Sequence, residues 1–260
     1  MSDSAPSEPQ RPAHPESAVL GLVNLWRVSG VTDEDADTWL RLDVPEFQLW
    51  RTCGMITGEW RATGSLFLAS VVGAGAECFA VGTVPNVPWL ESVTGHRATA
   101  DGWELTGTGG TTVATLTADG APDPAATAAA LFTAPPTVTA DMRAALARPV
   151  ALPAGAVPAT AADLIGRWVP VGVPGPTDPF VRFDADGSWT GSDGCNGNGG
   201  RWAASGSGDL LATSGMSTMM FCEGAPVPSW VAQARLAVFD DGGLRLLAAD
   251  GAQLGRLERG

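Results

Sequence analysis

The stretch FVRFDADGSWT (180–190) decides the fold class of this chain. Apolar side chains alternate through FVRF as they do in a half-buried β-strand. The pair Asp186-Gly187 favours the type I′ turn of a β-hairpin, and SWT then begins a returning strand. A second hairpin of the same kind is predicted from LRLL (244–247), Asp250-Gly251 and AQLGRL (252–257). These signals predict a mainly β protein.

An internal repeat extends this prediction to most of the chain. WLRLD (39–43) resembles FVRFD (180–184), and DGWELTGTGGTTVATL (101–116) resembles DGGLRLLAADGAQLGRL (241–257). Three pairs recur at an offset of 142: Trp26 and Trp168, Cys53 and Cys195, Trp60 and Trp202. Cys78 and Cys222 follow at 144, so one short insertion separates the copies.

The repeat predicts two domains, at residues 18–117 and 160–259. Each is expected to be a small antiparallel β-barrel or curled sheet with one short helix, at 88–93 in the first copy and 228–237 in the second. Residues 1–17 read as a disordered tail because they are rich in Pro, Ser and Glu.

The segment 118–159 is an Ala/Pro-rich, partly helical connector. Asp123 is expected to cap one short helix, and Thr139 is expected to cap a second that stops before Pro149. The stretch 149–161 then reads as an extended linker.

Charge and hydropathy exclude two classes of partner. The net charge is −13 and lysine is absent, whereas nucleic acid and anionic membranes demand a positive surface. No apolar run is long enough to insert into a membrane, and the N-terminus lacks the pattern of a signal peptide. We therefore expect a cytoplasmic protein, or an extracytoplasmic one if the start codon is misassigned.

The glycine-rich stretch GSDGCNGNGG (191–200) invites several interpretations. It lacks the GxxxxGK[ST] pattern of a phosphate loop, and an EF-hand beginning at Asp184 would place Cys195 where a glutamate is needed. We interpret it as a turn that brings Cys195 near Cys222. Asn196 and Asn198 suit such a turn because asparagine tolerates the left-handed conformation.

The second copy resembles the META/HslJ-like domain family. The residues that carry the resemblance are Gly194, Cys195, Asn196, Gly200, Trp202, the apolar LLA (210–212), Thr218 and Cys222. The first copy departs from this pattern, since Gly54 replaces Asn196 and no residue before Cys78 corresponds to Thr218. The resemblance implies a compact β-rich domain with a helix, common in bacterial envelope or stress-related proteins, and no catalytic residues.

The four cysteines leave several readings open. The repeat makes Cys53–Cys78 and Cys195–Cys222 the economical disulfide pairs. Buried inert thiols suit a cytoplasmic location equally well, and a reactive redox thiol is a third reading. Zinc bound by all four cysteines would need ligands from both domains, and no CxxC motif is present.

Catalysis finds little support in the sequence. The two histidines, His14 and His96, lie outside the second copy, which excludes a Ser-His-Asp site or a histidine-ligated metal there. Asp184, Asp186 and Asp193 could serve a paired-carboxylate hydrolase, although acids beside Asp-Gly turns are ordinary hairpin residues.

The ten tryptophans allow a ligand site in a barrel mouth, but their recurrence in both copies favours core packing. The sequence therefore predicts a non-enzymatic META-domain protein without cofactor or metal. Its expected role is binding or scaffolding of an unidentified protein or small ligand, with a link to stress. The alternatives are a small-ligand binding protein that uses a barrel mouth, and a hydrolase that uses the three aspartates.

Overall fold

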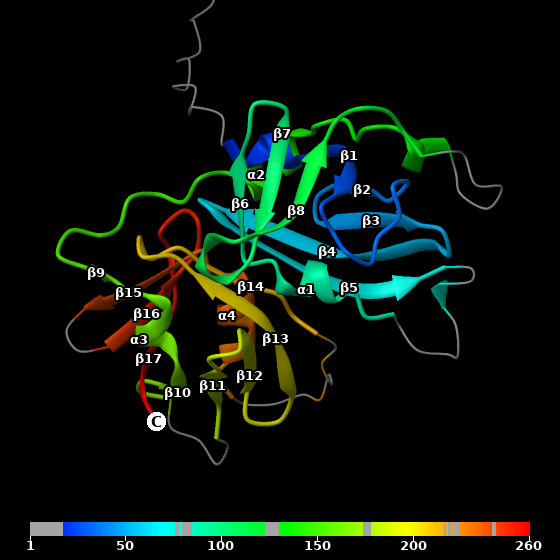
Figure 1. Cartoon of the computed structure of the whole chain (residues 1–260). Helices are drawn as coiled ribbons and strands as arrows, with labels where there is room; N and C mark the ends of the chain where they lie inside the picture. Colours follow the sequence, from blue (N-terminus) through cyan, green and yellow to red (C-terminus); the bar gives the residue numbers. More distant parts are fainter. Residues whose placement is uncertain are drawn as a thin grey trace, which may run out of the picture.

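The computed structural model of the chain describes residues 18–75, 78–79, 85–122, 130–173, 178–215, 217, 220, 224–240 and 243–260. The predicted tail at 1–17 and the predicted cap at Asp123 lie outside these residues. In the described part, a closed antiparallel barrel is followed by a curled nine-stranded sheet (Figure 1). The mainly β fold class is confirmed.

The first barrel is built from eight strands in chain order. They are β1 (Asn24–Ser29), β2 (Trp39–Leu42), β3 (Glu46–Arg51), β4 (Gly54–Thr63), β5 (Leu66–Ala74), β6 (Gly95–Ala98), β7 (Gly102–Thr106) and β8 (Thr112–Thr117). Pairing of β1 with β8 closes the barrel, and β5 and β6 are joined by one registered pair, Leu66 with Gly95. The helix α1 (Pro88–Ser92) precedes β6, as predicted.

The second sheet has the order β14-β13-β12-β11-β10-β17-β16-β15-β9. Its strands are β9 (Val157–Pro158), β10 (Gly166–Pro170), β11 (Phe180–Phe183), β12 (Ser188–Ser192), β13 (Gly197–Ala204), β14 (Leu210–Ala212), β15 (Leu236–Asp240), β16 (Gly243–Leu247) and β17 (Gln253–Arg259). An isolated bridge between Asp209 and Leu236 joins the start of β14 to β15, so the sheet curls almost into a second barrel.

The tryptophans that recur in the sequence make the same contacts in both halves. Trp26 donates its indole N–H to the carbonyl four residues earlier, at 2.8 Å, and Trp168 does the same at 2.7 Å. Trp60 and Trp202 donate to the carbonyls of Asp43 and Asp184. All four indoles are buried, so these residues pack in the core, as the recurrence suggested.

Both predicted hairpins are present, but the predicted turn type is wrong. Gly187 N–H donates to the carbonyl of Asp184 at 3.1 Å, and Gly251 N–H donates to the carbonyl of Ala248 at 3.0 Å. Each glycine therefore ends a four-residue turn, with φ of 83° and 84°, instead of occupying one of its two central positions. The left-handed φ still explains why glycine stands there.

The helix predicted at 228–237 is shorter than expected. Helix α4 runs from Val227 to Gln233, and Ala234 leaves it with ψ of 143°. Ala237 was expected on the helix but lies in β15, because the strand must begin at Leu236 to pair with Leu247.

The connector is packed along both halves of the molecule. Thr139 caps α2 (Ala140–Ala145) as predicted, accepting the Met142 N–H, and the helix ends before Pro149. Met142 and Leu146 are buried in the core of the first barrel. The linker expected at 149–161 is not free, since β9 pairs with β15 before the short helix α3 (Ala161–Leu164) begins.

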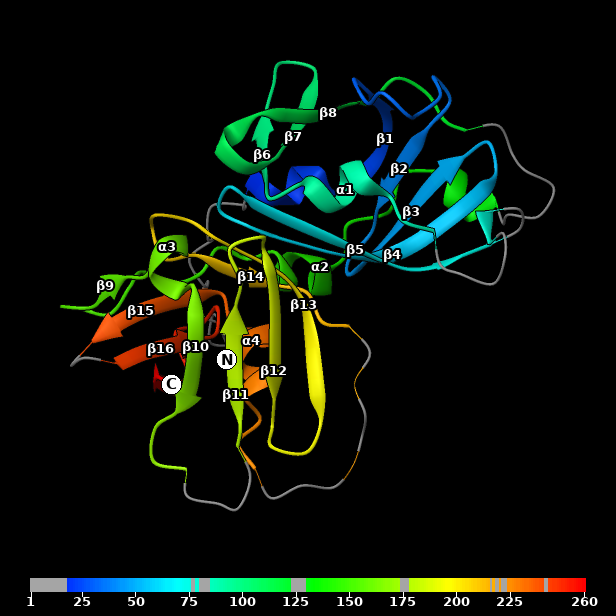
Figure 2. The same cartoon turned by 60° about the horizontal axis from the view of Figure 1, so that its bottom comes forward.

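The two halves also contact each other. Strand β5 lies against β13 and β14, as both views show (Figures 1 and 2). Leu66 and Leu68 from β5 are buried together with Ala203 and Leu211. Among the described residues, every helix is too short to cross a membrane.

Candidate functional site

The residues that carried the family resemblance gather at the turn between β12 and β13. The Asp193 carboxylate accepts the N–H groups of Cys195 at 2.9 Å and Asn196 at 2.6 Å. Gly194 has φ of 105°, a conformation that suits glycine. The stretch 191–200 is therefore a turn flanked by strands, as predicted.

Asn196 has a larger role than the turn residue expected from the sequence. Its side chain is buried and donates to the Asp193 carboxylate at 3.0 Å and to the Met220 carbonyl at 2.8 Å. Its carbonyl oxygen accepts the Met220 N–H at 2.8 Å. One carboxamide thus fixes the turn to the segment that follows β14. Sequence reasoning missed this role because the partner, Met220, lies 24 residues away along the chain.

A hollow of about 320 Å³ opens beside this turn. It is lined by Asp193, Asn196, Asn198, Ser214, Ser217, Pro226, Pro228, Ser229 and Ala232. The chain after β14 forms one wall, because Thr213 and Gly215 donate their N–H groups to the carbonyls of Arg201 and Gly199. Helix α4 and Pro226 before it form another wall.

Three donors already bond the carboxylate in the hollow. Partial burial raises the pKa of Asp193, but the bonds from Asn196 and from the Cys195 N–H outweigh it, so the pKa is lowered. Asp193 is therefore ionised at neutral pH and is not available as a general acid. Its oxygens accept one side-chain and two backbone donors, which leaves little capacity for a cation.

The structure does not bring the three candidate aspartates together. Asp184 and Asp186 belong to the turn before β12, whereas Asp193 follows the other end of that strand. Asp184 is paired with Arg182 at 2.8 Å, and Asp186 accepts the Ser188 N–H and hydroxyl. Hydrogen bonds from Ser188 lower the pKa of Asp186. Each carboxylate has a local structural task.

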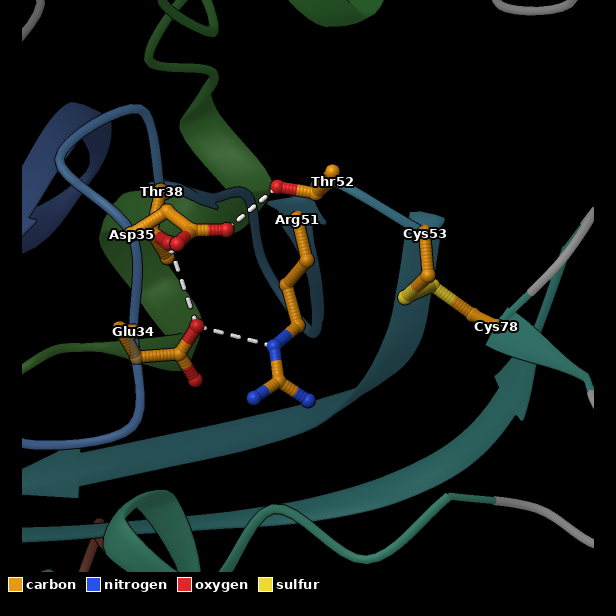
Figure 3. The surroundings of a disulfide bond; sticks show 7 residues. All are labelled: Glu34, Asp35, Thr38, Arg51, Thr52, Cys53 and Cys78. Carbon is orange, nitrogen blue, oxygen red and sulfur yellow. Dashed lines mark hydrogen bonds and ion pairs between the residues drawn. A yellow bond between two sulfur atoms is a disulfide. The ribbon is translucent and has the colours of Figure 1, made fainter.

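The cysteines are oxidised wherever the structure describes them. Cys53 and Cys78 form a disulfide, which joins the β3–β4 turn to the segment after β5 (Figure 3). Cys195 is also disulfide-bonded, so the thiol and zinc readings do not hold for these three residues. Thr218 and Cys222 lie outside the described residues, and the pairing of Cys195 with Cys222 stays a prediction.

A second hollow, of about 390 Å³, lies under the loop that joins β1 to β2. The side chain of Glu34 in that loop is almost fully buried and accepts hydrogen bonds from Arg51 and Thr38 (Figure 3). It also accepts the indole N–H of Trp89. Arg27 donates to the Ala36 carbonyl and pairs with Asp119. These charged groups are occupied in holding the loop on the barrel. We therefore regard the first hollow as the better candidate site.

Comparison with known proteins gives a family match for the second sheet. Residues 162–259 match the family model described as META domain. Neither the curated proteins nor the solved structures compared with the chain include a match. The match covers the second sheet from β10 to β17 and includes the hollow beside Asn196. Among the described residues, no cluster of three or more His, Cys, Asp or Glu side chains could hold a metal ion.

Proposed function

Because residues 162–259 match the META domain, we propose that this chain is a non-enzymatic binding protein. We propose that the hollow beside Asn196 is its binding site. The observation that carries this proposal is a preformed concavity with unused hydrogen-bonding groups. None of the described residues bonds the Asn198 carboxamide nitrogen or the Ser214 hydroxyl, and both groups line the hollow. A ligand gains affinity by bonding such groups.

The chemistry of the wall selects a small neutral ligand. The ionised Asp193 repels anions, and its oxygens, already bonded by three donors, give a cation little to bind. Serine hydroxyls and carboxamides bond hydroxyl or amide groups, while Pro226 and Pro228 offer apolar surface. We propose a polyhydroxylated or amide-bearing small molecule as the ligand class.

Titration calorimetry with a panel of neutral polyols, sugars and short amides tests this proposal. Asn198→Ala combined with Ser214→Ala should weaken a binder about 10-fold or more, since two hydrogen bonds are lost. Asn24→Ala is the matched control, because Asn24 also accepts the N–H of the next residue but lies in the first barrel. Equal affinity of the double variant and the wild type would reject the hollow as the site.

The absence of enzymatic activity is part of the same proposal. It is supported by the separation of the three aspartates and by the lowered pKa values of Asp186 and Asp193. A hydrolase panel should give the same background for the wild type, Asp186→Ala and Asp193→Asn. A rate that disappears in either variant would restore the hydrolase reading. A link to stress rests on the family resemblance alone.

We also propose that the protein works in an oxidising compartment. The disulfides at Cys53–Cys78 and at Cys195 support this alternative over the cytoplasmic location expected from the sequence. Alkylation in the native host, before and after reduction, should find these cysteines blocked until a reductant is added. Free thiols at all positions would instead support the cytoplasm.

A further inference from the structure

The two halves of the molecule meet through corresponding elements. Leu68 in β5 precedes Ala69, which is in register with Trp60, and Leu211 in β14 precedes Ala212, which is in register with Trp202. The two leucines thus occupy the same place in their respective sheets. They are buried in one cluster at the contact between the halves.

Two arginines cross this contact in opposite directions. Arg61 in β4 donates to the Ala232 carbonyl in the last turn of α4. Arg201 in β13, the strand that corresponds to β4, donates to the Val93 carbonyl at the end of α1 at 3.3 Å. Each half therefore supplies a guanidinium to the helix end of the other half. Terminal helix carbonyls carry partial negative charge and lack partners within the helix, so they suit a cation.

Each guanidinium makes one hydrogen bond across the contact, while Arg201 Nη1 is buried without a hydrogen-bond partner among the described residues. Burial lowers the pKa of Arg61 and of Arg201, and this is opposed by Glu59 and Glu91 respectively. In the part of the chain that the structure describes, neither arginine has a carboxylate within ion-pair distance. Their direct bonds across the contact go to the helix carbonyls. The interface therefore requires a helix end at this place in each half.

The contact resembles a two-fold interface at the level of elements, because corresponding strands meet, although Arg61 follows Trp60 and Arg201 precedes Trp202. We infer that the META domain carries a pairing face, formed by β13, β14 and the end of α4, whose partner is a second barrel of the same build. In this chain the first barrel is that partner.

The inference is independent of the ligand proposed above, because the residues that make the contact, Arg201, Ala203 and Leu211, do not line the hollow. Of the lining residues, Asn198 lies at the start of β13, and Ala232 offers only its carbonyl to the contact.

A cut connector tests the pairing face in the full chain. A protease site inserted between Ala147 and Arg148 leaves α2 on the first barrel and leaves Val150 bonded to Ala249 of the second half. Both flanking residues are exposed. After cleavage, gel filtration and native mass spectrometry at micromolar concentration should find the two fragments as one 1:1 particle.

Substitutions within the face should separate the cut fragments. Leu211→Asp places a charge in the buried cluster and should weaken the pairing roughly 100-fold or more. Arg61→Met and Arg201→Met should each weaken it by up to about 10-fold, since each substitution removes one hydrogen bond to a helix carbonyl. Val72→Asp is the matched control in β5, because Val72 is 64% exposed.

Tryptophan fluorescence and circular dichroism of each fragment establish that the halves stay folded after cleavage. The cut wild-type fragments are also measured at about 10 times the first concentration, on the order of tens of micromolar. Fragments that stay separate at this concentration would overturn the inference. Unchanged pairing in Leu211→Asp and in both arginine variants would also overturn it.

Discussion

Asn196 shows how much one side chain decides at the candidate site. It is buried, and its amide bonds the Asp193 carboxylate, the Met220 carbonyl and the Met220 N–H. Removal of the carboxamide leaves backbone groups and a carboxylate without their partner, which is costly in a buried place. The hollow depends on these bonds because Asp193 and Asn196 both line it.

We predict that Asn196→Ala lowers the free energy of unfolding by about 2–3 kcal/mol. Urea denaturation measures the change. Asn198→Ala, a neighbour that bonds only the next N–H, should stay within about 1 kcal/mol of the wild type. Equal effects of the two substitutions would mean that the bonds to Met220 contribute little.

His96 makes the stability of the first barrel depend on pH. The ring is buried against Trp103, and burial lowers its pKa from 6.5 to about 4, opposed only in part by a backbone contact with Gly64. A histidine with a depressed folded pKa stabilises the fold above its unfolded pKa of about 6.5, and this stability is lost as pH falls toward 4.

We therefore predict that unfolding at pH 5 requires about 2 kcal/mol less than at pH 7 because of His96. The measurement is urea denaturation at both pH values for the wild type and for His96→Gln, whose carboxamide does not titrate. Subtracting the pH-dependent change in the free energy of unfolding of His96→Gln from that of the wild type removes the contribution of the carboxylates. If both proteins lose the same stability, His96 is not the group responsible.

At the scale of elements, the disulfide ties a hairpin turn to the segment after β5. The bond between Cys53 and Cys78 spans 25 residues, and a loop of that size constrains the unfolded chain. We predict that Cys53→Ser with Cys78→Ser lowers the free energy of unfolding by about 3 kcal/mol. Ser65→Ala, at an exposed position between β4 and β5, should change it by less than about 0.5 kcal/mol. Denaturation without reductant measures both.

Sequence patterns located the elements better than their ends. The alternation in FVRF and the recurrence of Trp26 at Trp168 predicted strands and core residues that the structure contains. The end of α4 was placed too late, because alanine at 234 and 237 fits a helix as well as a strand and only pairing with β16 decides. The linker before Ala161 was misjudged for the same reason, since β9 exists only through β15.

The candidate site was less accessible to prediction than the fold. Asp193 and Asn196 were singled out from the glycine-rich stretch, but the hollow also needs Ser214 and the prolines before Trp230. The lining residues thus come from three separate segments of the chain. How close these segments lie to one another depends on where β14 ends. In the first barrel the corresponding strand continues to Ala74, whereas β14 stops at Ala212. No local pattern in the sequence reports that difference.

For the whole molecule, the contact between the halves couples their stability. Because Leu68 and Leu211 lose their cover if either half unfolds, we predict one calorimetric transition for the wild type. Leu68→Asp should split it into two, as each half then melts on its own. Val72→Asp should keep a single transition, and two transitions in the wild type would show that the halves are independent.

The edge strands of the second sheet determine whether a neighbouring molecule can pair with it at high concentration. The border strand β9 has only two residues, Val157 and Pro158, and proline has no N–H to offer a newcomer. The opposite border, β14, already faces the first barrel and is bridged to β15 through Asp209. A neighbouring molecule thus finds almost no template at the borders of this sheet on which to add its own backbone.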